Sequence, residues 1–210
     1  MKKNIQGICF GIGAGWDSAS KLACEQMEKH TGILCTPILA RPENAPEGWS
    51  PSWWKMCAFD LVNDSTDYVL VFDADIVCIR DWTPYLHDAP FMAVREFHSA
   101  TRAIEAKNYQ VRDYFNGGFF VIHRSMQDRL ESLRDYGPRY GSWLEQTALN
   151  QIFADVWKPL PSQCNWLIEE ETRGLQGAID SLAANLHLAG TKDPNQIINY
   201  MQKIREVTKQ

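Results

Sequence analysis

Apolar positions along the first 75 residues fall into continuous runs that are separated by segments with helical spacing. Continuous apolar runs bounded by polar residues or glycine are typical of strands covered on both faces, and here they predict strands at 5–12, 33–39 and 67–72. The segments between them predict helices at 17–30 and 52–62. Asp17 and Ser52 are the expected N-caps, and Gly32 is the expected stop of the first helix. Because strands alternate with helices, we expect an α/β fold with a largely parallel central sheet.

The second half of the chain has a less regular pattern, in which short apolar runs predict strands at 91–97, 119–123 and 184–190. Helical spacing predicts amphipathic helices at 143–156 and 194–207, the second of which begins at a proline. No internal repeat, linker or charge run interrupts the pattern. We therefore expect a single domain over 1–210.

The composition is that of a folded globular protein, with 45% hydrophobic and 22% charged residues. A formal net charge of −5 argues against a nucleic-acid-binding protein, which would need a basic surface. The six cysteines form no CxxC pair, so we interpret them as reduced thiols and not as a zinc site. The N-terminus has no continuous apolar signal segment, and no apolar run is long enough to span a membrane. These observations lead us to expect a cytoplasmic protein.

Two aspartates, Asp73 and Asp75, follow the apolar run at 67–72 in the sequence LVFDADIV. Residues two positions apart in extended backbone project to the same side, and both would stand at the carboxyl end of a strand, where open α/β sheets bind ligands. Two carboxylates held close together repel unless a cation or proton separates them, and a hard divalent metal is the usual solution. In the alternative without a ligand, one aspartate caps the next turn and the other is solvated.

A haloacid-dehalogenase-type phosphatase is a second interpretation of the DADIV segment, with Asp73 as nucleophile and Asp75 as acid/base. The corresponding strand usually opens the domain in that family, whereas 72 residues precede Asp73 here. The chain also lacks a Gly-Thr after the second aspartate and a later GDxxxD-like segment. This alternative requires hydrolysis of a phosphomonoester without any nucleotide.

Five segments extend the pattern beyond the two aspartates. They are SWWKMCAFDLV with Lys55, DADIVCIRDWTPYL, YFNGGFFVIHRS at 114–125, EQTALNQIF at 145–153 and HLAGTKDP at 187–194. Taken in order, they resemble the GT-A-type nucleotide-sugar glycosyltransferases and, within them, the glycogenin-like retaining family, glycosyltransferase family 8. The resemblance covers 53–194, and its specificity comes from the order of five short matches.

The resemblance implies a Rossmann-like GT-A domain that moves a hexose from a nucleotide sugar, foremost a UDP-sugar, to a hydroxyl-bearing acceptor with retention of configuration. It implies a manganese or magnesium ion bound by Asp73, Asp75 and His187 against the diphosphate. Donor-binding roles are implied for Trp16, Lys55, Asp73, Asn116, Gly117, Gly118 and Lys192. Glu145 and Gln146 are the expected catalytic residues, with Gln146 assisting a same-face attack in which the leaving diphosphate accepts the acceptor's proton.

The chain departs from the family pattern in the same segments. Glu145 stands where the family more often has aspartate, and Asp193 separates Lys192 from the following proline. Glu145 and Gln146 also fit as ordinary residues of a first helical turn. Two consecutive glycines in a strand, Gly117 and Gly118, are explained equally well by close approach to a ligand or by a β-bulge.

The glycine-rich loop at 11–15 precedes a helix but lacks the G-x-G-x-x-G spacing and the later acidic residue of a dinucleotide site. In the resemblance this loop receives the nucleotide base, with Trp16 or Asp17 as a contact. The mixed segment 95–115 is the expected cover over donor and acceptor. A non-catalytic nucleotide-sugar-binding protein also stays open, since the sequence lacks the C-terminal extension that many such enzymes place over the acceptor.

Overall fold

The computed structural model of the protein describes residues 3–96, 113–136, 144–168, 177–178, 182–189 and 193–207. Most of the expected cover segment and Lys192 lie outside these described residues. Among the described helices, none combines the length and apolar character that a membrane span requires.

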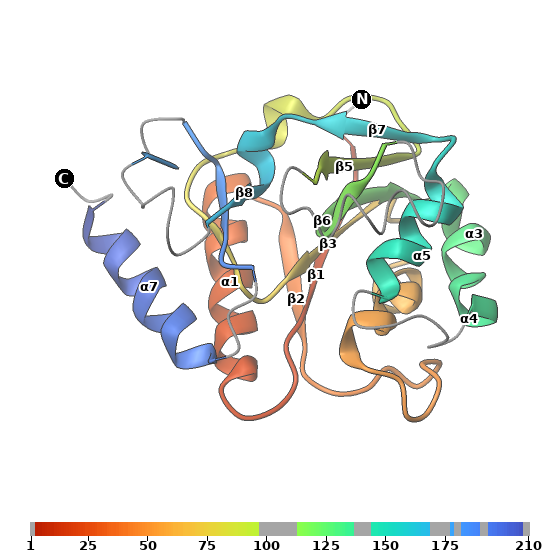
Figure 1. The fold of residues 1–210 in the computed structure, drawn as a ribbon, viewed down its shortest axis with the longest axis horizontal. Helices are drawn as coiled ribbons and strands as arrows, with labels where there is room; N and C mark the ends of the chain where they lie inside the picture. The colour runs from red at the N-terminus through yellow and green to blue at the C-terminus, as the bar shows by residue number, and fades with distance from the viewer. Residues whose placement is uncertain are drawn as a thin grey trace. The chain divides into compact units, whose positions relative to one another are not determined.

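A six-stranded, mostly parallel sheet forms the centre of the fold, in the order β2-β1-β3-β6-β5-β7 (Figure 1). Its strands are β1 Ile5–Phe10, β2 Leu34–Ile38, β3 Tyr68–Asp73, β5 Phe91–Arg95, β6 Phe115–His123 and β7 Trp157–Leu160. A second sheet has the order β4-β9-β8, formed by β4 Ile76–Cys78, β9 Asn185–His187 and β8 Trp166–Leu167. The predicted α/β class with a largely parallel sheet is confirmed.

The helices of the described residues are α1 Trp16–Thr31, α3 Gln127–Glu131, α4 Leu133–Tyr136, α5 Leu144–Phe153 and α7 Pro194–Val207. The 3₁₀ segments are η1 Pro51–Leu61, η2 Thr83–Tyr85, η3 Arg124–Met126 and η4 Ser162–Asn165. The chain divides into two compact units that interleave along the sequence. One comprises 1–6, 41–71 and 87–160, and the other 7–40, 72–86 and 161–210. A single domain over the whole chain stays a prediction.

The core of the first unit is an aromatic cluster beneath β5 and β6. The Phe91 ring stacks on Phe153 at 4.3 Å and on Phe120 at 5.1 Å between centroids, and Phe115 packs on Trp157. Strand β5 pairs antiparallel with β6 and parallel with β7, while α5 packs on β6 with α3 and α4 beside it (Figure 1). This packing sets the position of α5 relative to the strand that carries the FNGG sequence.

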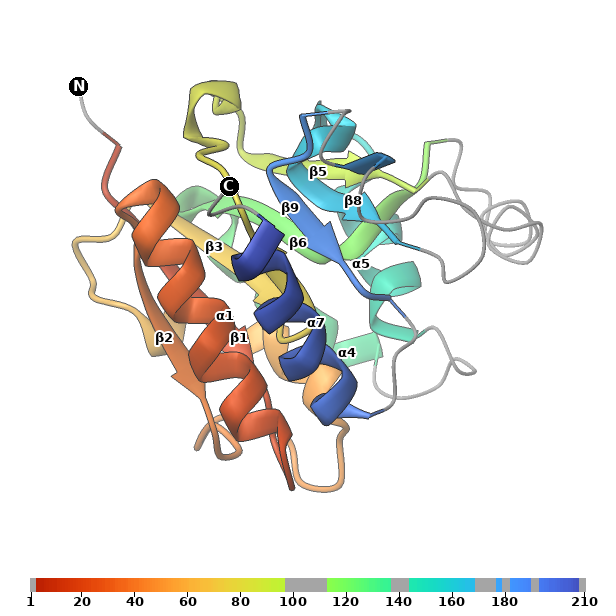
Figure 2. The same cartoon turned by 90° about the vertical axis from the view of Figure 1, so that its left-hand side faces the viewer.

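The second unit is built around α1, which packs on β2 and lies alongside α7 (Figure 2). The side chain of Trp82 is fully buried and its Nε1 donates to the Met27 sulfur at 3.1 Å. Pro194, the first residue of α7, lies against Gly15, where an added Cβ would come within 2.5 Å of the proline ring. The start of α7 therefore packs closely on the start of α1.

The helix starts differ from the sequence prediction. The N-cap of α1 is Gly15, in the left-handed region at φ 86°, so Asp17 is a first-turn residue and not the cap. A negative charge in the first turn of a helix is stabilised by the positive end of the helix dipole, so Asp17 is still favourable at this position. Ser52 is likewise not a cap, because Pro51 at the first helical position places Ser50 at the N-cap of η1. Gly32 is confirmed as the C-cap of α1, with its N–H donating to the Glu28 carbonyl at 2.8 Å.

Candidate active site

Asp73 and Asp75 lie where the chain passes from the larger sheet to the smaller one. Asp73 is the last residue of β3, Asp75 occupies the two-residue turn that follows, and Ile76 begins β4. Strand β4 pairs antiparallel with β9, with Ile76 opposite His187, and the Leu188 N–H donates to the Asp75 carbonyl at 3.0 Å. Backbone pairing thus carries His187 to the aspartates across 112 positions of sequence.

The three side chains form a compact set of donors in the second unit. One ligand atom from each of Asp73, Asp75 and His187 lies within 4.8 Å of the other two. The Nε2 of His187 is 3.3 Å from the Asp75 Oδ1, and their side chains are 5% and 13% exposed. Opposite ligands of an ion with bonds of about 2.1 Å lie about 4.2 Å apart, so this spread fits one divalent ion. Two carboxylates and an imidazole are a donor set that manganese and magnesium accept.

Three buried cysteines of the second unit have raised pKa values. Burial raises the pKa of Cys9 well above its ordinary value, and the nearby Cys24 thiol and Asp73 carboxylate raise it further. Burial also raises the pKa of Cys78 and of Cys164 to about 12. All six cysteines are free and buried. The group of possible metal ligands found among the described residues consists of the two carboxylates and the imidazole.

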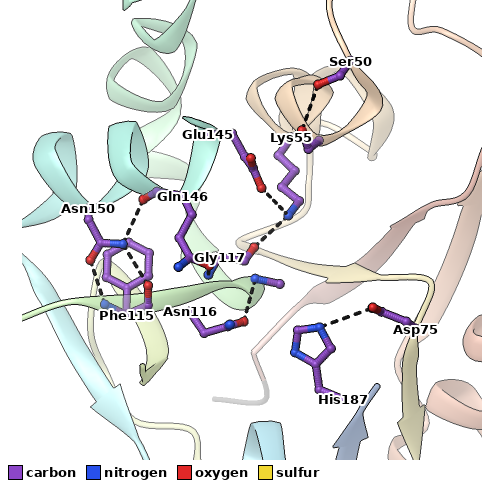
Figure 3. Close-up of polar contacts among 12 residues, drawn as sticks. Ser50, Lys55, Asp75, Phe115, Asn116, Gly117, Glu145, Gln146, Asn150 and His187 are labelled. Atoms are coloured by element: carbon purple, nitrogen blue, oxygen red, sulfur yellow. Dashed lines mark hydrogen bonds and ion pairs between the residues drawn. The ribbon is translucent and has the colours of Figure 1, made fainter. Parts of the chain in front are cut away.

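A second polar cluster lies in the first unit and centres on Lys55. Its Nζ donates to the Gly117 carbonyl at 2.9 Å and pairs with Glu145 Oε1 at 3.4 Å (Figure 3). The Lys55 side chain is only 2% exposed and the Glu145 side chain 17%. Figure 3 shows the three groups converging from η1, β6 and α5. Lys55 therefore connects η1 to β6 and α5, and its expected role toward the donor stays a prediction.

Two amide side chains of α5 fasten this helix to β6. Asn150 is fully buried, and its side chain accepts from the Phe115 N–H at 2.7 Å and donates to the Phe115 carbonyl at 2.8 Å. Gln146 Oε1 accepts from the Gly117 N–H at 2.7 Å. A Cβ on Gly117 would lie only 3.2 Å from the Gln146 side chain, so the glycine allows the helix this close approach. The predicted catalytic glutamine is thus fixed against the FNGG sequence.

The FNGG sequence forms an irregular stretch of β6. Arg95 pairs with Phe115 and Ala93 with Phe120, so a step of two residues along β5 corresponds to a step of five along β6. This shift in register supports the β-bulge interpretation of the two glycines. Within the bulge, the Asn116 Oδ1 accepts from the Gly118 N–H at 2.9 Å.

Two further polar residues, Glu96 and Asn165, each contact one predicted site residue, and neither was predicted from the sequence. Asn116 Nδ2 donates to Glu96 Oε2 at 2.8 Å, and His187 Nδ1 is 3.0 Å from Asn165 Oδ1. Glu96 had a usable signal, because it lies at the carboxyl end of the strand predicted at 91–97, where open α/β sheets bind ligands. Asn165 had none, because its partner is 22 positions away. The remaining expected donor contact, Trp16, is half-buried at the start of α1.

Comparison with protein families matches residues 26–192 to the model described as glycosyl transferase family 8. Comparison with curated protein sequences gave no match. A glycosyltransferase involved in glycosylation of the major capsid of PBCV-1 is similar in structure, with a TM-score of 0.67 and 13% identity over 94% of this chain and 99% of that one. The galactosyltransferase LgtC, solved with donor and acceptor sugar analogs, has a TM-score of 0.60 and 14% identity over 97% and 95%. GlyE of Streptococcus pneumoniae TIGR4 has a TM-score of 0.63 and 15% identity over 98% of this chain and 63% of that chain.

Proposed function

The chain belongs to glycosyl transferase family 8, and on that premise we propose that it moves a hexose from a UDP-sugar to a hydroxyl-bearing acceptor, with a divalent metal and with retention of configuration. Family membership supports glycosyl transfer, and the similar structures share the fold. The phosphatase alternative gains no support from these comparisons.

The observation that carries the metal-dependent part is the compact donor set of Asp73, Asp75 and His187. These residues would hold manganese or magnesium, which when bound supplies Lewis-acid stabilisation of the negative charge on a departing diphosphate. Asp73 is held by the end of β3, and Asp75 and His187 by the pairing of β4 with β9. Because their positions are set by backbone hydrogen bonds, the ligands are preorganised for the ion.

The residues of the first unit fit recognition of the sugar. Gln146 is 8% exposed, and its buried Nε2 has no hydrogen-bond partner among the described residues; we propose that a substrate oxygen accepts from it. Its Oε1 is already bonded to Gly117, which makes Gln146 a donor in the proposed reaction. Asn116, Gly118 and Glu145 are proposed to contact the donor sugar, as the family resemblance implies. Paired hydrogen bonds of this kind are what discriminates one hydroxyl pattern from another.

Gln146 is proposed to assist a same-face attack by the acceptor hydroxyl. In that reaction the bond from the anomeric carbon to the diphosphate breaks, the bond to the acceptor oxygen forms, and the acceptor's proton passes to the diphosphate. Lys55 is proposed to act through the Gly117 carbonyl and Glu145, which it holds in place. Trp16 and Lys192 are proposed contacts of the nucleotide and the diphosphate. The six buried, free cysteines support a cytoplasmic location.

The proposal is tested by calorimetric titration of UDP-sugars with and without manganese, together with assay of transfer to simple sugar acceptors. We expect nucleotide-sugar binding that requires the metal and is lost in the variant Asp73→Asn/Asp75→Asn. Asp64→Asn, which removes an exposed carboxylate elsewhere, is the matched control. Metal-dependent binding that survives the double substitution would remove the proposed site. Affinity for UDP without any product would favour a binding protein, and phosphomonoester hydrolysis without nucleotide would favour a phosphatase.

A further inference from the structure

The side-chain amide of Asn165 contacts the imidazole nitrogen of His187 that does not face Asp75. His187 Nδ1 lies 3.0 Å from Asn165 Oδ1, and the two residues are 4% and 3% exposed. An amide oxygen can only accept a hydrogen bond, so the proton of the neutral imidazole must be on Nδ1. Nε2 then presents its lone pair on the side where the Asp75 carboxylate lies at 3.3 Å. This is the tautomer that can bind a metal through Nε2.

The chain segment on both sides of Asn165 is hydrogen-bonded to β9 and its flanking residue. Asn165 ends η4, and three consecutive contacts tie this region to β9 and the residue before it. The Ala184 N–H donates to the Gln163 carbonyl at 2.8 Å, Asn185 Nδ2 to the Cys164 carbonyl at 2.7 Å, and the Ile168 N–H to the His187 carbonyl at 2.9 Å. The parallel pairing of β8 with β9 continues the same connection. Because the backbones are tied on both sides, the amide oxygen has a defined position behind the ring.

We propose that Asn165 is a positioning residue for the metal site, which fixes the Nδ1–H tautomer and the orientation of His187 so that Nε2 meets the ion together with Asp73 and Asp75. This inference rests on the proposed metal-dependent function. Partners that hydrogen-bond the far nitrogen of a metal-binding histidine typically change metal affinity by about 10- to 100-fold when they are removed. Asn165 acts in this proposal through the imidazole that it contacts.

The test measures manganese binding to the intact protein from the electron paramagnetic resonance signal of the free ion. Asn165→Leu keeps a similar volume but removes the acceptor, and it should weaken manganese binding by about 10- to 100-fold. Asn165→Asp keeps an acceptor oxygen and should bind manganese within about threefold of the unmodified protein or more tightly. Ser162→Ala, in the same 3₁₀ segment, is the control and should leave affinity unchanged. Melting temperatures without metal establish that each variant is folded.

A second readout requires no variant. Nitrogen-15 NMR of the metal-free protein reports which nitrogen of His187 carries the proton, and we expect Nδ1. Absence of a proton from Nδ1, or a folded Asn165→Leu that binds manganese as tightly as the unmodified protein, overturns the inference about Asn165. Absence of manganese binding in the unmodified protein, or unchanged binding in Asp75→Asn, instead overturns the proposed metal site. The two failures are therefore distinguished in one set of samples.

Discussion

Replacement of Asn150 by alanine should be one of the most damaging single changes to the first unit. The side chain is fully buried and satisfies both the N–H and the carbonyl of Phe115, at 2.7 and 2.8 Å, and it also donates to the Gln146 carbonyl at 2.9 Å. Alanine leaves the two Phe115 groups without this partner in a dry environment, at about 1 to 3 kcal/mol each. With a small cavity added, we expect the free energy of unfolding to fall by about 4 kcal/mol.

The loss is measured by urea unfolding followed by tryptophan fluorescence, and by differential scanning calorimetry. For a chain of 210 residues the expected decrease corresponds to a melting temperature lower by about 10 °C. Gln151→Ala, one position along the same helix and only partly buried, is the matched control and should change stability by less than about 0.5 kcal/mol. A loss below about 1 kcal/mol for Asn150→Ala would show that α5 is not fastened to β6 by this amide.

The remaining expectations concern the buried charge pair and the buried thiols. Glu145→Gln should lower the free energy of unfolding by about 3 kcal/mol in the native background, because it leaves the Lys55 charge buried without this carboxylate, but by less than about 1 kcal/mol when Lys55 is already methionine. Additive losses in this double-mutant cycle would contradict the coupling. Ellman's reagent should react slowly with the native thiols at pH 8 and with all six after denaturation, since each is buried; rapid native reaction would contradict this. The pKa of Cys164 is raised to about 12, so its contribution to stability is complete below the unfolded pKa, near 8.5, and is lost as the pH rises toward 12. Cys164→Ala should therefore reduce the alkaline decline in unfolding free energy by about 1.4 kcal/mol per pH unit above about pH 9, and equal slopes would exclude this origin.

The regular part of the fold follows from local pattern. The strands predicted at 33–39 and 67–72 and the helix at 194–207 are found as β2, β3 and α7, with ends that differ by at most two residues. The two carboxylates after a buried strand indicated a divalent metal only as one of several interpretations, and the family resemblance added His187 as the third ligand. The structure brings the predicted Asp73, Asp75 and His187 together.

Contacts between residues far apart in sequence could not be predicted from the local pattern. Lys55 and Glu145 are 90 positions apart, and nothing near either residue indicates that they pair. Residue preference predicted Asp17 as the N-cap of α1. The N-cap is Gly15, where Pro194 packs so closely that a side chain would not fit. The helical spacing at 52–62 was correct in kind, but the 3₁₀ geometry of η1 is a property of its packing and is not encoded in its periodicity.

The pairing of β4 with β9 also bears on the order in which the protein is made. Asp75 leaves the ribosome 112 residues before His187, so a nascent chain carries both aspartates for most of its synthesis without the histidine. The three proposed metal ligands are together only after His187 has been translated and β9 has paired with β4. On the proposed function, metal binding therefore follows the pairing of β9 with β4 during biogenesis.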